Sequence, residues 1–245
     1  MIRGLTGAMF EAKKSTGPIV EIPSLEVYSR GFLDHVLTSP ISPPYTLNLW
    51  VKQGRNQSTS LTDSPLFFSC GGMTTGSAFG NSGQTSEWIK FFSALNQPRY
   101  WVQFRGFVVQ SDFDWHFLTC VVTNSYMPFT LFVDGVKTST SYSRGMGIVG
   151  TTTKGSHFGF FARTGNGIDV GENSQWIGSI ARMAFFGKAL SDDEAFSAYE
   201  NRYALPTNAD HAWEGVISGG TVKDTVGNMD LMVVGDVVQG EYITV

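Results

Sequence analysis

Three side chains around Trp115 have the types and spacing that acid–base chemistry uses. Asp112, Asp114 and His116 alternate along the chain, so they share one face if the segment is extended. Glycoside hydrolysis needs two carboxyl groups on the two sides of the bond to be broken. The four histidines, at positions 35, 116, 157 and 211, lack metal-site spacing, and there is no Gly-x-Ser-x-Gly elbow or phosphate loop. Scattered histidines are usually packed or solvated, and we expect no enzyme activity.

A polar loop at residues 163–175 carries the oxygen ligands that Ca²⁺ prefers. These are Asn166, Asp169, Glu172 and Asn173. Their spacing matches no known calcium loop, so a solvated polar loop is the alternative interpretation. We therefore expect no required cofactor, with Ca²⁺ at this loop as the one candidate.

Two tryptophans stand beside polar loops, where an aromatic ring could stack on a sugar. Trp176 follows the 163–175 loop, and Trp88 follows the uncharged, glycine-rich segment 71–86. Sugar sites usually combine an exposed aromatic ring with an amide or carboxylate, and Asn173 supplies the amide. Most of the six tryptophans should nevertheless belong to the core. The sequence thus predicts Trp176, Trp88 and Asn173 as candidate ligand-binding residues.

These side chains must be positioned by strands, and the clearest strand signal lies at residues 115–136. Asp134-Gly135, between two valines, predicts a two-residue β-hairpin turn, because both residues tolerate φ > 0. The strand at 115–123 is apolar on both alternating faces, which predicts burial on both sides. Residues 45–52 alternate cleanly except for Trp50 on the polar face, so we expect that face to be covered.

One short helix is predicted near residues 192–203. Ser191 can cap it, Glu194 can close a capping box, and Asp192 and Asp193 favour the positive end of the helix. Pro206 prevents continuation. One helix among ten or more strands predicts an all-β fold, a two-sheet antiparallel sandwich.

Composition narrows the class of protein and its partners. The chain has 245 residues, of which 42% are hydrophobic and 16% charged, as in an ordered globular protein. A net charge of −4 without a lysine or arginine cluster indicates that the partner is not a nucleic acid. The N-terminus lacks the apolar core of a signal peptide, and no segment is long and apolar enough to span a membrane.

The order of several segments resembles the concanavalin A-like lectin/glucanase superfamily, and within it the laminin-G-like and pentraxin-like jelly rolls. The segments are Leu49-Trp50-Val51, Trp115-His116, Leu131-Phe132-Val133-Asp134-Gly135 and the run from Ile177 to Glu194. The resemblance implies a jelly roll and, in many relatives, Ca²⁺ at one end of the sandwich. The Glu-x-Asp-x-Glu strand of the family's glucanases is absent, and Asp112 and Asp114 fall where the family has a turn.

The resemblance also implies a division of the chain and a setting for it. We expect an N-terminal arm at 1–18, the jelly roll at 19–204, and a C-terminal segment at 205–245. That segment either completes the sandwich in permuted order or contacts a neighbouring subunit.

A non-catalytic jelly roll of this kind is expected in a virion, made in the host cytoplasm. There it would decorate a bacteriophage capsid or form a collar, tail or fibre. Its partners would be other virion proteins or copies of itself. The alternative is a lectin-like module for cell-surface glycans, with or without Ca²⁺.

Overall fold

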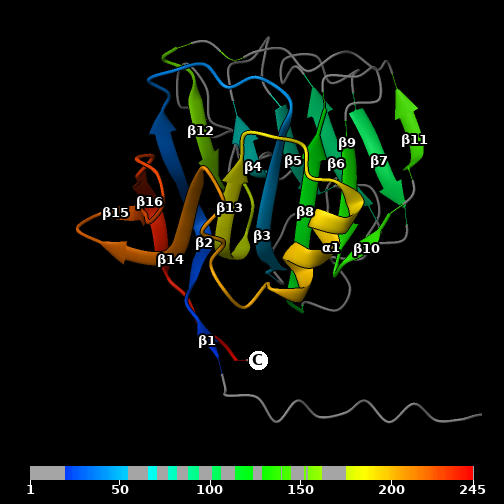
Figure 1. Ribbon diagram of the computed structural model, residues 1–245. Coiled ribbons are helices and arrows are strands. Elements are labelled where there is room, and N and C mark those ends of the chain that lie inside the picture. The colour runs from blue at the N-terminus through cyan, green and yellow to red at the C-terminus, as the bar shows by residue number, and fades with distance from the viewer. Residues whose placement is uncertain are drawn as a thin grey trace, which may run out of the picture.

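Antiparallel strands dominate the computed structural model of the protein (Figure 1). The structure describes residues 20–54, 66–70, 77–81, 88–93, 101–105, 114–123, 129–138, 140–144, 152, 154–161 and 175–244. Fifteen strands form one continuous sheet that folds into two layers, and β1 (Glu21–Ile22) pairs separately with β17 (Ile243–Thr244). The predicted all-β jelly-roll sandwich is confirmed.

Each layer has its own set of strands. In sheet order, the first layer contains β10 (Val136–Lys137), β9 (Phe129–Val133), β8 (His116–Val122), β3 (Tyr45–Gln53) and β13 (Gly178–Phe186). The second contains β12 (His157–Phe160), β4 (Leu66–Cys70), β5 (Ser77–Asn81), β6 (Trp88–Ser93), β7 (Trp101–Arg105) and β11 (Thr140–Arg144). The layers are joined by β14 (His211–Ser218), β15 (Thr221–Asp224), β16 (Leu231–Gln239) and β2 (Ser24–Val36).

Strand β2 belongs to both layers. Its first half pairs with β13, Leu25 opposite Ile180, and its second half pairs with β12, Leu33 opposite Phe160. Strand β16 runs along β2 over most of its length, from Met232 to Gln239. The C-terminal strands β14 to β16 therefore lie inside the sheet and contribute to the same fold as β2.

The inner faces of the two layers form the main core. Along β3, Leu47, Leu49 and Val51 point inward, as the alternation in the sequence predicts. Across the layers, the rings of Phe158 and Phe185 lie 5.6 Å apart, edge to face. The burial of both faces of β8 and the Asp134-Gly135 hairpin, in which Val133 pairs with Val136, are confirmed.

The two cysteines belong to this inner core. Cys70 and Cys120 are buried and free. Burial raises the pKa of Cys70 to about 12 and raises the pKa of Cys120 as well. The two thiols are therefore packed as small apolar side chains.

The outer face of the first layer is covered by α1 (Asp192–Glu200), as the position of Trp50 predicted. The Trp50 ring lies against Tyr203, with centroids 6.2 Å apart, and against Phe117 at 5.6 Å. The helix ends three residues earlier than predicted. Asn201 leaves helical geometry, with φ of −97° and ψ of 15°, and the Arg202 N–H donates to the Tyr199 carbonyl, only three residues back, at 3.2 Å. Within the described residues, no helix has the length and apolar character needed to cross a membrane.

The start of α1 has the predicted capping box. The N–H of Glu194 donates to Ser191 Oγ at 3.2 Å, and the N–H of Ser191 donates to the Glu194 carboxylate at 2.8 Å. Replacing Ser191 by alanine leaves one helix donor without its partner. We expect the free energy of unfolding to fall by about 1 kcal/mol, measured by urea denaturation followed by circular dichroism.

A matched variant, Ser197→Ala, removes the same hydroxyl from the middle of the helix. Because alanine is the better helix former, this change should be neutral or should stabilise by up to about 0.5 kcal/mol. Equal losses in the two variants would contradict the capping role of Ser191.

Candidate functional site

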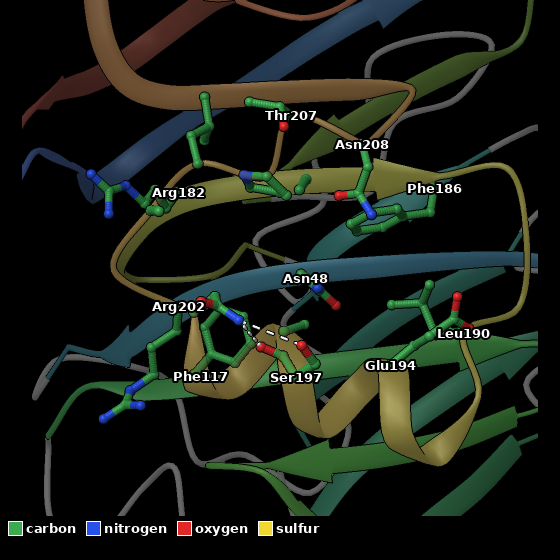
Figure 2. A pocket seen from close by; sticks show the side chains of 16 residues that line it. Asn48, Phe117, Arg182, Phe186, Leu190, Glu194, Ser197, Arg202, Thr207 and Asn208 are labelled. Carbon is green, nitrogen blue, oxygen red and sulfur yellow. Dashed lines mark hydrogen bonds between the residues drawn. The ribbon is translucent and has the colours of Figure 1, made fainter.

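A cavity of about 350 Å³ lies on the outer face of the first layer, between the sheet and α1 (Figure 2). Strands β3, β8 and β13 contribute Asn48, Phe117 and Ala184 to it. Helix α1 lines one side, and residues 204–208 line another. The cavity is therefore built from segments about 150 residues apart in the sequence, which only the tertiary fold brings together.

A β-bulge in β13 shapes one end of the cavity. Trp50 pairs with Ala181 and Asn48 with Ala184, so two residues of β13 oppose Leu49 alone. The extra residue, Arg182, has φ of 44°, in the left-handed region that costs an L-residue about 1–2 kcal/mol. Bulges redirect side chains next to functional sites. Here the bulge places Arg182 on the lining of the cavity.

Arg182 is a poorly paired charge. Its side chain is 11% exposed, and Nη2 lies 3.9 Å from Glu214 Oε2, too far for a hydrogen bond. Within the described part of the chain, Nε and Nη1 are buried without a hydrogen-bond partner. Burial lowers the pKa of Arg182, and the Glu214 carboxylate opposes this shift. Figure 2 shows the guanidinium pointing away from Asn48, so it bounds the cavity without pointing into it.

Asn48 supplies an acceptor that lacks a donor. It is 3% exposed, and among the residues that the structure describes no group donates to Oδ1. Two residues earlier, on the same face of β3, Thr46 is fully satisfied: Oγ1 donates to the Lys188 carbonyl at 2.9 Å and accepts from the Leu190 N–H at 3.0 Å. A buried carbonyl without a partner costs about 1–3 kcal/mol. Asn48 therefore presents an unused acceptor at the cavity.

The helix side of the cavity is already paired. Lys188 and the Ser191 N–H hydrogen-bond Glu194 and hold its pKa at about 2, so it stays an anion. Asn201 Nδ2 donates to the Ser197 carbonyl at 2.9 Å, as drawn in Figure 2. The Arg202 guanidinium lies 4.0 Å from the centre of the Tyr199 ring. Glu194 is therefore not a proton donor near neutral pH.

The four histidines have structural partners. His116 Nδ1 lies 2.7 Å from Asp134 Oδ2, His157 Nδ1 lies 2.8 Å from Asp34 Oδ2, and His211 Nδ1 lies 2.6 Å from Asp224 Oδ2. His35 Nδ1 lies 2.9 Å from the Asp230 carbonyl oxygen. Of the alternating trio, Asp114 is exposed and Asp112 lies outside the described residues. The structure therefore places His116 in a pair with Asp134 of the hairpin turn.

The predicted ligand-binding residues are not brought together. Trp176 is fully buried in the inner core, so the prediction of an exposed ring there is wrong. Its backbone N–H donates to the Phe161 carbonyl at 2.7 Å, and both residues belong to the inner core cluster. Trp88 begins β6, and its side chain lies outside the part of the structure that is described, so its role stays a prediction. Asn173 and the predicted Ca²⁺ ligands Asn166, Asp169 and Glu172 lie outside the described residues, and their roles stay predictions.

Sequence reasoning missed Asn48 and Arg182 as site residues. A signal for Asn48 was present, because it shares with Trp50 the face of β3 that must be covered. Arg182 had none, since a bulge in an otherwise regular apolar strand depends on register with β3.

Comparisons with known proteins agree with this architecture. A family model described as "Concanavalin A-like lectin/glucanases superfamily" matches residues 32–196, more than half of the chain. None of the curated proteins matches the sequence significantly.

Two solved structures have a similar fold. A heptameric SAP-like pentraxin from Limulus polyphemus has a TM-score of 0.60 at 10% identity, covering 90% of this chain and 95% of its own. A proposed carbohydrate-binding protein from Bacteroides ovatus has a TM-score of 0.57 at 12% identity. That likeness covers 91% of this chain and 60% of the other protein. At such identities the likeness shows a shared fold.

Proposed function

We propose, since the chain belongs to the concanavalin A-like lectin/glucanase superfamily, that this protein is a non-catalytic, lectin-like module that binds a glycan. We further propose that the cavity between β3, β13 and α1 receives one or two neutral sugar units. The observation that carries this proposal is the buried Oδ1 of Asn48, an acceptor without a donor in the described structure.

The lining of the cavity suits a sugar. Its apolar members include Phe117, Phe186 and Leu190, and its polar members include Ser197 and Thr207. Small-molecule sites are mostly apolar with a few placed polar groups, and about 350 Å³ is near the lower end of their usual volumes. A sugar ring has apolar C–H faces and hydroxyl donors, so it can contact the apolar wall and donate to Asn48.

Charge argues for a neutral ligand. Glu194 is a carboxylate paired with Lys188, and Figure 2 shows Arg182 and Arg202 pointing away from Asn48. An anion placed against Asn48 Oδ1 would meet an acceptor, and the two arginines among the described lining residues point away from it. This favours hydroxyl or amide donors over carboxylate or sulfate groups.

The test is binding to a glycan array, followed by titration calorimetry on the best ligands. Asn48→Leu removes the acceptor, and Ala184→Leu fills the cavity. We expect each change to weaken glycan binding at least tenfold, which corresponds to about 1.4 kcal/mol.

A matched control is Asn228→Leu, which makes the first substitution at an exposed turn outside the cavity. Its affinity should equal that of the unmodified protein. Unchanged binding in both cavity variants would show that the glycan site lies elsewhere.

The role in a virus particle and the homo-oligomer stay predictions. Exposed apolar side chains where β2 and β16 pair favour a protein contact: Tyr28 is 63% exposed, Met232 62% and Val238 42%. Such a contact would use a surface other than the cavity, so the two functions are compatible.

A further inference from the structure

The floor and the mouth of the cavity differ sharply in solvent exposure. At the floor, Asn48, Ala184 and Phe186 are at most 3% exposed. At the mouth, Ser197, Asn201, Thr207 and Asn208 are exposed. A ligand that fills this cavity must therefore place one donor and an apolar group deep inside and its other polar groups outside.

Among the described floor residues, Asn48 Oδ1 is the buried polar side-chain atom without a hydrogen-bond partner. Ala184 is the cross-strand partner of Asn48, so a methyl group lies directly beside the unused acceptor. Phe186 and Leu190, the next apolar lining residues, are packed in the same outer cluster as Ala184. None of these three side chains can donate a hydrogen bond.

An amide N–H suits this acceptor better than a hydroxyl. Both can donate to Asn48 Oδ1, but a buried hydroxyl also brings two acceptor lone pairs, which the Ala184, Phe186 and Leu190 side chains cannot satisfy. An amide nitrogen brings none, and an acetyl methyl next to it would fill the apolar space over Ala184.

The mouth can satisfy the remaining atoms of such a group. The Thr207 hydroxyl and the Asn208 amide are donors for an amide carbonyl oxygen. In Figure 2 the Asn208 side chain extends from its chain segment toward Phe186, over the cavity. Ring hydroxyls would then meet the exposed polar side chains and water.

We propose that the cavity selects sugars that carry an N-acetyl group, with the acetamido N–H donating to Asn48 Oδ1 and the methyl group packing on Ala184. The inference rests on the proposed glycan-binding function and names the ligand class of the same site.

The experiment compares matched sugars on the full chain by titration calorimetry. The pairs are the methyl glycosides of N-acetylglucosamine and glucose, and of N-acetylgalactosamine and galactose. We expect the acetylated member of at least one pair to bind at least tenfold more tightly. In saturation-transfer NMR its acetyl methyl protons should receive more saturation than the ring protons.

Two variants locate the selectivity. Ala184→Leu and Asn48→Leu should each reduce the preference to less than twofold, while Asn228→Leu should keep it. Asn48→Leu removes a buried polar group without a donor, so its midpoint of urea unfolding should equal or exceed that of the unmodified protein. This keeps a loss of binding distinct from a loss of folding.

The outcomes separate the two proposals. If glycans bind in the cavity but acetylated and plain sugars differ by less than twofold, the N-acetyl inference is overturned and glycan binding stands. A preference that survives both cavity variants also overturns the inference. If neither the array nor the four glycosides bind, both proposals fail together.

Discussion

Replacing Trp213 by alanine should lower the free energy of unfolding by about 3–5 kcal/mol, the range for truncating a fully buried tryptophan. Trp213 lies on β14 with no exposed surface, and its ring centroid is 5.6 Å from that of Phe158 and 5.9 Å from that of Phe160. Its Nε1 donates to the Met229 carbonyl at 2.8 Å, which links β14 to the turn before β16. Urea denaturation followed by circular dichroism measures the change.

The control is Val216→Ala on the same strand. Val216 is 46% exposed, so the loss should stay below about 1 kcal/mol. Because Trp213 lies in the 205–245 segment, a loss of less than about 1 kcal/mol for Trp213→Ala would show that this segment is not part of the main core.

Removing the Asp224 carboxylate should make stability much less sensitive to acid. Burial pulls the pKa of Asp224 up, but the backbone N–H groups of Ala212, Met229 and Gly227, together with His211, hold it at about 2. The side chain has no exposed surface, and these donors lie within 3.0 Å of its oxygens. One carboxylate thus holds the start of β14 against the turn that leads to β16.

The direction of the pH dependence follows from the lowered pKa. The charged form is favoured in the folded state, so its contribution is complete above the ordinary pKa of 3.8 and is lost as the pH falls from about 4 to about 2. A difference of that size corresponds to roughly 2 kcal/mol. We expect Asp224→Asn to be less stable than the unmodified protein by at least about 2 kcal/mol at pH 7, with the gap narrowing below pH 4.

Urea unfolding of both proteins between pH 7 and pH 2 measures this gap. The control Asp193→Asn changes an exposed carboxylate in the first turn of α1, and it should cost less than about 1 kcal/mol at pH 7. A constant gap between Asp224→Asn and the unmodified protein across the whole pH range would contradict the proposed role of the charge.

The burial pattern of strand β2 could not be predicted from the periodicity of its sequence. Leu25, Val27 and Leu33 all enter the inner core. Between them, however, the three successive residues 28–30 are exposed, and the four residues 31–34 are buried in succession. The alternation is interrupted around Gly31, whose Cα approaches β16 so closely that a Cβ would stand 2.7 Å from the Asp236 backbone. A strand that turns from one layer into the other breaks the alternation by which strands are recognised.

The sequence by itself determined the features that depend on neighbouring residues. Asp134-Gly135 made the hairpin because its backbone tolerates φ > 0, and Ser191 with Glu194 started the helix because their side chains bond its first N–H groups. Trp50 on a polar face also indicated that something had to cover β3, without saying what.

Only the tertiary structure decided the site. Asn48 became an acceptor without a donor because the segment that covers β3 satisfies Thr46 and stops short of Asn48, and Arg182 became a lining residue because β13 gains one residue against β3. Trp176 was buried because it pairs with Phe161 and packs in the inner core between the layers. These outcomes depend on register and packing between distant segments, and local residue patterns carry no information about either.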